Sequence, residues 1–337
     1  MRTRTKAGIV ILAAVLSLLA GAGIGSVSVS PADICRVLAS RLFGLPLPEN
    51  FSSVTPGLVL NIRLPRVTLS FAAGAAAAMG GVVMQSVLKN PLASPYGLGV
   101  SSGAGLGAAL VIVSGLGAGA LGTLALPAVS LAFGLATVGA AIFLSSRLDR
   151  SLSNNTIILT GMVLSLFTNA LMSTVSAANP EYSQRILLWQ LGSFSGRGWE
   201  ASAMVAAVAA VCLAGFLRLS PELDAMTFGE EQARALGVEL RRVKWVLIVL
   251  VAALTGTSVA FVLGFVDLIA PHVVRRFFGA RHRLVLPMAA LLGGAFMTVC
   301  DLAARTLASP SEIPVGSITA LIGAPFFLYV YFSHRRR

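Results

Sequence analysis

The chain has 337 residues, of which 56% are hydrophobic and 11% charged, and its 25 Lys and Arg outnumber its 13 Asp and Glu. A single soluble domain of this length could not enclose so much apolar surface, so a soluble globular protein is excluded. The basic excess does not indicate a nucleic-acid partner, because Lys and Arg stand in short segments between apolar runs. The composition predicts an all-α integral membrane protein with one transmembrane domain over residues 1–337.

Apolar runs mark the membrane segments. A helix that crosses a bilayer needs about 20 mostly apolar residues. Nine runs meet this requirement, at residues 8–29, 64–88, 93–114, 119–146, 156–177, 201–218, 243–264, 284–304 and 315–332. A tenth run, 268–278, is too short to cross alone at about 1.5 Å per residue, so we expect it to be a short helix or one buried by its neighbours.

The basic residues predict the orientation of the chain. Lys and Arg in short loops stay on the cytoplasmic side of a membrane. With the N-terminus inside, most of the 25 basic residues fall on the inside. The exceptions are Arg36, Arg41, Arg63, Arg66, Arg185, Arg197 and Arg305. The bias holds only if 268–278 returns the chain to the cytoplasm. We therefore predict about ten transmembrane helices, including one short helix, with both termini cytoplasmic.

Small residues are dense in the second and third segments, as "GAAAAMGG" at 74–81 and "SSGAGLGAAL" at 101–110. Small residues at spacings of three and four let membrane helices pack closely. The glycines at 103–107 do not indicate a dinucleotide-binding loop, since no strand precedes them. We expect close helix packing at both places.

The break between the second and third segments reads "NPLASP" at 90–95. Pro91 and Pro95 exclude a continuous helix here, so the freed backbone groups need partners inside the protein. Asn90 is expected to cap the third helix. We interpret this segment as structural first, and as part of a gate or of a contact with an ATPase second.

The longest polar interior stretch, 218–244, is predicted to be a cytoplasmic loop. Within it "FGEEQARALG" predicts a short helix, with Glu230 and Glu231 in the first turn and Gly237 as the stop. This helix either touches only its own protein or docks a motor subunit. The motor would be separate, because the chain lacks a G-x-x-x-x-G-K-[ST] phosphate loop. It also lacks a nucleophile elbow, an H-E-x-x-H pair and a metal-binding cluster, so we expect neither enzymatic activity nor a bound metal.

The stretch "GFVDLIAPHVVRR" at 264–276 places charges within the short tenth run. Pro271 is expected in the first turn of the short helix, where a missing N–H costs little. Arg275 and Arg276 are expected at its cytoplasmic end. Asp267 is open to three interpretations: a cap or first-turn neighbour of the positive helix end, a charged group in a path or gate, or a remainder that covers a neutral, protonated acid and an impaired variant.

Seven stretches together resemble the FecCD/BtuC-type permeases of bacterial ABC importers, the type II importers of iron-siderophores, haem and cobalamin. The stretches are "IRLPR" at 62–66, "MQSVLKNPLASPYGLGVSSGA" at 84–104, "WQLGSF" at 189–194, "FGEEQARALGV" at 228–238, "LIAPHVVRR" at 268–276, "DLAAR" at 301–305 and "EIPVGSITALIGAPFFLYV" at 312–330. The resemblance implies a homodimer with a translocation path between subunits in the cytoplasmic (inner) membrane of a bacterium or archaeon. It further implies two cytoplasmic ATPase subunits, which would bind the ATP and Mg²⁺, and an extracytoplasmic binding protein.

The resemblance also assigns roles to residues. The ATPase-docking positions are Gly229, Glu230, Glu231, Ala233, Arg234, Leu236 and Gly237. Three outer arginines, Arg63, Arg66 and Arg305, would receive acidic residues of the binding protein, for which the rigid guanidinium fork is suited. The expected path residues in the fifth span are Thr160, Met162, Ser165, Asn169 and Met172. His272 matches the family pattern. Asp267 departs from it, because the family has Gly there.

A rival hypothesis is a proton-coupled secondary transporter that uses Asp267 or Asp301, since carboxyl groups inside membrane segments are costly and usually functional. Asp301 lies one helical turn before Arg305 and is expected to pair with it, which weakens its case as a proton carrier. The sequence leaves the cargo open among siderophore, haem, cobalamin and molybdate.

Overall fold

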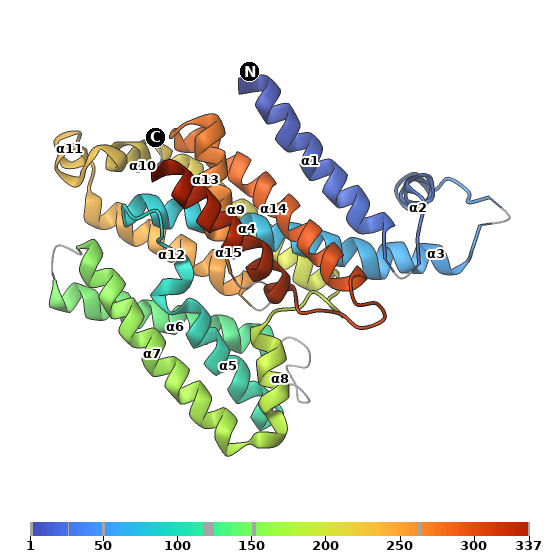
Figure 1. Cartoon of the computed structure of the whole chain (residues 1–337), viewed down its shortest axis with the longest axis horizontal. Coiled ribbons are helices and arrows are strands. Elements are labelled where there is room, and N and C mark those ends of the chain that lie inside the picture. Colours follow the sequence, from blue (N-terminus) through green and yellow to red (C-terminus); the bar gives the residue numbers. More distant parts are fainter. Residues whose placement is uncertain are drawn as a thin grey trace.

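The computed structural model describes residues 3–25, 27–48, 51–116, 125–149, 153–259, 261 and 264–335. Helices make up most of this part of the chain, and it contains no strand (Figure 1). Each of the ten predicted segments contains a helix. These helices are α1 (Thr3–Gly23), α4 (Leu64–Val87), α5 (Val100–Ser114), α6 (Ala125–Leu148), α7 (Asn154–Ala178), α9 (Trp199–Arg218), α12 (Leu240–Ser258), α13 (Val266–Phe278), α14 (His282–Thr306) and α15 (Val315–Arg335).

Six stretches of helix within the described residues are long and apolar enough to cross a membrane. They lie in α1, α6, α7, α9, α14 and the continuous stretch Val54–Val87 that ends with α4. The all-α membrane architecture is confirmed. That all ten helices cross the bilayer stays a prediction, because α5 and α13 are short and α12 carries three basic residues near its start.

Shorter helices lie between these segments. They are α2 (Pro31–Phe43), α3 (Val54–Gly57), the π-helix η1 (Leu58–Arg63), the 3-10 helix η2 (Pro95–Leu98), α8 (Pro180–Gln190), α10 (Ser220–Phe228) and α11 (Glu230–Ala235). Two of them, α10 and α11, form the polar loop predicted at 218–244. Neither α2 nor α8 was predicted from the sequence.

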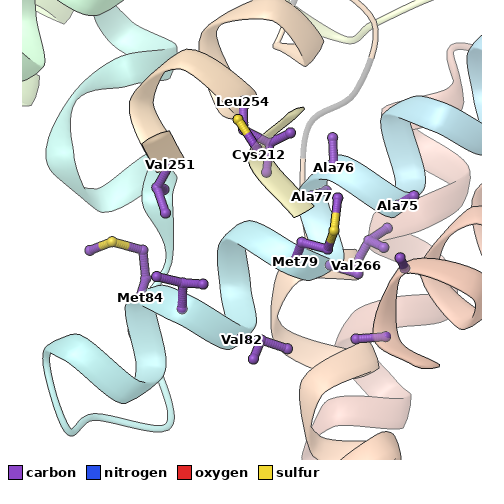
Figure 2. Packing of buried hydrophobic residues seen from close by; sticks show 14 of the residues in the cluster. Ala75, Ala76, Ala77, Met79, Val82, Met84, Cys212, Val251, Leu254 and Val266 are labelled. Carbon is purple, nitrogen blue, oxygen red and sulfur yellow. The ribbon is translucent and has the colours of Figure 1, made fainter. Parts of the chain in front are cut away.

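Helix α4 is the centre of the fold, and 89% of the most apolar window in the stretch Val54–Val87, which ends with α4, is buried. It contacts α14, α9, α12 and α13. Figure 2 shows its small side chains among residues of other helices, such as Cys212, Leu254 and Val266. An added Cβ at Gly74 would lie 2.3 Å from the carbonyl oxygen of Gly293 in α14, so the two backbones nearly touch. The predicted close packing of 74–81 is confirmed.

The second small-residue run, 101–110, packs α5 against α6. An added Cβ at Gly103 would lie 2.8 Å from the carbonyl oxygen of Phe133, and one at Gly107 would lie 2.9 Å from that of Val129. Both approaches require glycine, so the interpretation as close packing is confirmed here as well. Figure 1 shows α5 to α8 grouped along the lower left of the molecule.

The helix ends gather in two sets at opposite ends of α4 and α14. Near the end of α4, Ser86 lies 2.6 Å from His282 at the start of α14, and His282 contacts Asp224 in α10. Near the start of α4, Arg66 contacts Asp301 close to the end of α14. We call these two ends of the bundle the inner and the outer end, after the sides of the membrane on which the sequence predicts them.

Candidate functional site

Arg63 lies at the outer end and is buried, with 4% of its surface exposed. Its guanidinium donates to the carbonyl oxygens of Ala22, Gly23 and Val27, the first two at 3.0 and 2.8 Å. Carbonyls at the end of a helix have no partner within the helix, and a cation there is favoured by the helix dipole. Arg63 therefore caps the outer end of α1.

Arg66 forms the most extensive ion pair at the outer end. Its Nε lies 3.1 Å from each carboxylate oxygen of Asp301, and its Nη2 lies 2.8 Å from one of them. The other edge of the guanidinium bonds Glu312 in the loop before α15, at 2.7 and 3.1 Å. Arg66 thus joins α4, α14 and this loop.

Arg305 is also turned inward. It donates to the carbonyl oxygen of Gly21 in α1, and its Nε lies 3.8 Å from Asp301. The pairing of Asp301 with Arg305 expected from their spacing is therefore long, and Arg66 is the closer partner. Acceptors within the chain bind all three of Arg63, Arg66 and Arg305 in this conformation. That these arginines also receive acidic residues of a binding protein stays a prediction.

The "NPLASP" segment breaks the helix as its prolines predict. Helix α4 ends at Val87, and Pro95 opens η2 after the capping residue Ser94. The prediction for Asn90 is wrong, because α5 begins only at Val100. The side-chain oxygen of Asn90 instead accepts from Leu92 N–H at 2.9 Å, which closes a local turn after Pro91.

A cavity of about 540 Å³ lies between α5, α7, α8 and α13. Two of the expected path residues, Asn169 and Met172, line it together with Asp267. Its polar wall also includes Ser94, Tyr96, Ser101, Ser102, Trp189 and Gln190. This cavity is the strongest candidate in the described chain for a section of a translocation path.

The other three expected path residues do not line this cavity. Thr160 is buried and lies 3.1 Å from Ser145 of α6, and Ser165 donates to the carbonyl of Gly161 within its own helix. Met162 is 48% exposed, on the side of α7 that no other part of the described chain covers. The sequence placed all five on one helix, but a helix shows different faces to its neighbours.

Asp267 lies in the first turn of α13, and its side chain is buried. The hydroxyl of Ser94 donates to its carboxylate, which links α13 to the break after α4. The first-turn position agrees with the interpretation of Asp267 as a neighbour of the positive helix end. The place in the cavity wall agrees with the interpretation as a group in a path. The two interpretations are compatible with each other.

Pro271 lies inside α13 rather than at its first turn, so that prediction is wrong. The helix begins five residues earlier, directly after Phe265, whose φ is 57°. Proline cannot donate to the carbonyl four residues before it, which here is that of Asp267. The side chain of Gln85 approaches this carbonyl at 3.4 Å instead. His272 follows Pro271 and packs edge-on against Phe327 of α15, with ring centroids 6.0 Å apart.

Arg275 ties the far end of α13 to α4. It donates to Gln85 Oε1 at 3.2 Å, to Val82 O at 3.0 Å and to Ser86 Oγ at 2.8 Å. Ser86 in turn lies 2.6 Å from His282, so a chain of polar contacts continues to α10. The sequence predicts Arg275 only at the end of the helix and gives no sign of this network.

The loop helix α11 has the predicted bounds. Gly237 takes a left-handed conformation with φ of 84°, and its N–H and that of Val238 donate to Arg234 O and Ala233 O. This pair of bonds is a Schellman ending. At the other end Gly229 has φ of 134°, which favours glycine.

The expected docking residues of α11 divide into two sets. Glu231, Arg234 and Leu236 are exposed, and Leu236 has 70% of its surface free. Ala233 is buried. Glu230 is turned inward to Lys244, and their charged atoms are 2.9 Å apart. Next to the exposed set lies a groove of about 720 Å³ lined by Arg234, Val238, Glu239, Leu240, Arg241, Arg242, Trp245 and Val246.

Several functional candidates were missed by sequence reasoning. Lys244, Asp224, His282 and Glu312 all make polar contacts that join separate elements. One signal was available for Lys244 and His282, because each lies at the edge of an apolar run. No group of three His, Cys, Asp or Glu side chains suited to a metal ion occurs in the described ranges.

Comparison with known proteins gives a consistent result. The model of the FecCD transport family matches residues 10–333. The Fe(3+)-citrate import system permease protein YfmE of Bacillus subtilis is 35% identical over 97% of this chain and 95% of its own length. The hemin transport system permease protein HmuU of Yersinia pestis is 36% identical over 82% of this chain and 84% of its own length.

The solved structures include one of similar architecture. It is an inward-facing conformation of an ABC transporter assigned to the metal-chelate type. The match has a TM-score of 0.84 and 31% sequence identity, and it covers 98% of this chain and 99% of the other. Sequence and fold therefore point to the same group of membrane proteins.

Proposed function

Because this chain belongs to the FecCD transport family, we propose that it is the membrane-spanning permease subunit of a binding-protein-dependent ABC importer. Its cargo would be a metal chelate of the iron-siderophore, haem or cobalamin type. The observation that carries this proposal is the family match over residues 10–333, supported by the fold match to a metal-chelate transporter. The site of action is the cytoplasmic membrane, which the chain crosses several times.

We propose ten membrane crossings with both termini in the cytoplasm. The separation of helix ends into an inner and an outer set supports this topology. Lys6 near the start of α1 donates to Phe277 O at the end of α13, and α13 leads directly to the inner contact of His282 with Asp224. The first helix and the polar loop therefore share the inner end, where the basic residues are concentrated.

A second copy of the chain would complete the path. Only 28% of the most apolar window of α7 is buried, although Asn169 and Met172 of this helix line the cavity. Its exposed apolar residues are Leu159, Met162, Val163, Leu166, Phe167 and Leu171. In a homodimer these side chains would lie against the partner copy or lipid, and the cavity would open toward the shared interface.

A separate ATPase would bind at the inner end, through Glu231, Arg234 and Leu236 of α11 and the adjoining groove. Mixed charges around exposed apolar side chains are typical of a docking surface. The ATPase would hold ATP and Mg²⁺, and this chain would bind no cofactor and catalyse no reaction itself. Conduction would follow from a change in the relative position of the helices.

An extracytoplasmic binding protein would deliver the cargo at the outer end. In the conformation described here Arg63, Arg66 and Arg305 fix the positions of α1, α4 and α14 instead of facing outward. Their contribution to docking would be indirect, because they hold in place the helix ends on which the binding protein rests.

The test is reconstitution of the chain with its cognate ATPase and binding protein in liposomes. We expect uptake of at least one of three probes, ferric citrate, hemin or cobalamin, to depend on ATP. An ATPase variant that binds but does not hydrolyse ATP is the control. Uptake that is unchanged without ATP would overturn the proposal.

The rival proton-coupled mechanism is tested in the same liposomes. Asp301 is a poor proton carrier, because Arg66 binds both of its oxygens. Asp267 is the better candidate, since its carboxylate lines the cavity. Uptake driven by a pH gradient without ATP, and lost in Asp267→Asn, would establish the rival.

A further inference from the structure

Lys244 is a buried lysine near the start of α12, with 1% of its side chain exposed. Its ammonium donates to Glu230 Oε1 at 2.9 Å and to Asn154 Oδ1 at 3.1 Å. Lysine is almost never fully buried unless its charge is paired. The contacts to a carboxylate and an amide oxygen make this an internal polar junction.

The junction joins the consecutive helices α11 and α12 to α7, whose Asn154 lies 90 residues before Lys244. Glu230 is the first residue of α11, Asn154 is the first residue of α7, and Lys244 belongs to α12. The exposed part of α11 is where the ATPase is proposed to bind. Helix α7 carries Asn169 and Met172 to the cavity wall. One ammonium group therefore lies between the docking helix and the path helix.

The ion pair between Lys244 and Glu230 is expected to hold α11 and α12 together. Removing one partner of a buried ion pair is strongly destabilising, because the remaining charge is left without compensation. The carboxylate of Glu230 is 29% exposed, so solvent screening makes the loss smaller here. By contrast, Glu230 and Arg234 are 3.9 Å apart on the surface of α11, and such a pair contributes little. A displacement of Glu230 should thus be followed by Lys244 rather than absorbed at the junction.

We propose that Lys244 is a positioning residue that couples movement of α11 to the N-terminal end of α7, and through α7 to the cavity wall. About 22 Å of helix separates Asn154 from Asn169 at about 1.5 Å per residue. A tilt imposed at the first turn of α7 therefore reaches the cavity. The inference rests on the proposed function, because it requires an ATPase that moves α11.

The sharpest variant is Asn154→Ala. It removes the amide link to α7 but leaves the ion pair of Lys244 and Glu230 intact, and it does not alter the helix cap, which is Ser153. Lys244→Met removes the charge and keeps most of the stem. Lys6→Met is the matched control, since it removes a lysine whose ammonium binds a single backbone carbonyl at the same end of the bundle.

The variants are compared in liposomes with the ATPase and binding protein, using the probe that the wild-type chain transports. We expect Asn154→Ala to keep ATP hydrolysis within about twofold and to lower uptake per ATP hydrolysed by about fivefold or more. Lys244→Met should lower this ratio further, and the double variant should be no worse than Lys244→Met, because both act through one junction. Lys244→Arg should recover part of the loss.

A second readout distinguishes coupling from mere stability. In a Cys35→Ser background, which removes an exposed thiol, Asn169→Cys reports access to the cavity by its rate of alkylation. We expect nucleotide to change this rate in the chain with Lys244 and Asn154 intact, and to leave it unchanged in Asn154→Ala. This readout does not depend on transport of any cargo.

Two results would overturn the inference. One is an Asn154→Ala protein that takes up as much cargo per ATP hydrolysed as wild type. In that protein nucleotide would also still change the alkylation rate of the Asn169→Cys thiol, as it does with Asn154 intact. The other is a parallel fall of hydrolysis, uptake and assembly, which would make the junction only structural. Failure of the proposed function would look different, because wild-type uptake itself would not depend on ATP. If Lys244→Met does not assemble, Asn154→Ala still decides between these outcomes.

Discussion

Arg66 and Asp301 form a two-pronged ion pair between α4 and α14, although they are 235 residues apart in the sequence. The side chain of Asp301 is 1% exposed and that of Arg66 is 11% exposed. A planar guanidinium fits this geometry, and the single ammonium of lysine does not. The pair fixes how the two central helices meet at the outer end.

We predict that Arg66→Met destabilises the protein strongly, by about 3–5 kcal/mol, because it leaves the buried carboxylate of Asp301 with only its longer contact to Arg305. Arg66→Lys should be less harmful but clearly below wild type. Thermal unfolding of the detergent-solubilised protein measures both. An Arg66→Met protein as stable as wild type would contradict the assignment of this pair.

Acid should weaken the same network through Glu312, which lies outside the membrane segments. The hydrogen bond from Arg66 holds the pKa of Glu312 below its ordinary value of 4.5. A carboxyl whose folded pKa is lowered stabilises the fold above its unfolded pKa, and this contribution is lost as the pH falls through the folded value. We expect the difference in unfolding temperature between wild type and Glu312→Gln to be largest near neutrality and to vanish well below pH 4.5. A difference that persists in acid would argue against the ion pair.

Gly81 of α4 lies against the backbone of α13 at Asp267. An added Cβ would clash with the carbonyl oxygen of Asp267, only 1.8 Å away. We predict that Gly81→Ala lowers the free energy of unfolding by roughly 1–3 kcal/mol or more, as overpacking does in close-packed interiors. Gly8→Ala is the control, since nothing lies within 4 Å of its added Cβ. Equal thermal stability of both variants would show that α13 can move away freely.

Asp267 should influence which cargo passes the cavity. Two unit charges about 10 Å apart repel by roughly 1.7 kcal/mol at an effective dielectric constant of about 20, which is roughly a 15- to 20-fold effect. We therefore expect Asp267→Asn to raise ATP-driven uptake of anionic ferric citrate relative to a neutral ferric trihydroxamate. Asparagine can still accept the hydrogen bond from Ser94, so folding should be kept. An unchanged ratio of the two rates would remove Asp267 from the path.

Hydrophobic runs and basic residues predicted the helices well, because membrane insertion depends mainly on segment length and charge. All ten segments contain a helix, and the ending of α11 at Gly237 follows from its left-handed backbone. The directions of side chains were not predictable in this way. Arg63 turns inward because the free carbonyls of α1 lie beside it, some 40 residues away in the sequence.

The errors at Asn90 and Pro271 have a similar origin. Helix-start preferences placed Asn90 at the cap of the third helix and Pro271 in the first turn of the short helix. The actual starts of α5 and α13 depend on contacts with other helices. Helix α13 tolerates an internal proline because Gln85 and Gly81 of α4 adjoin the carbonyl of Asp267 that the proline leaves without a donor. The cavity could not be predicted either, since its wall combines residues of α5, α7, α8 and α13 with others from η2 and the start of α15.

The end of α1 shows how the order of synthesis bears on this protein. The carbonyl oxygen of Gly23 accepts from Arg63, and that of Gly21 accepts from Arg305, which is synthesised 284 residues after Gly21. At about 5–20 residues per second, a ribosome needs roughly 14–57 s to cover that distance. For most of the time of translation the first helix is therefore held at its outer end by one arginine instead of two, and a chain truncated before α14 would leave it in that state permanently.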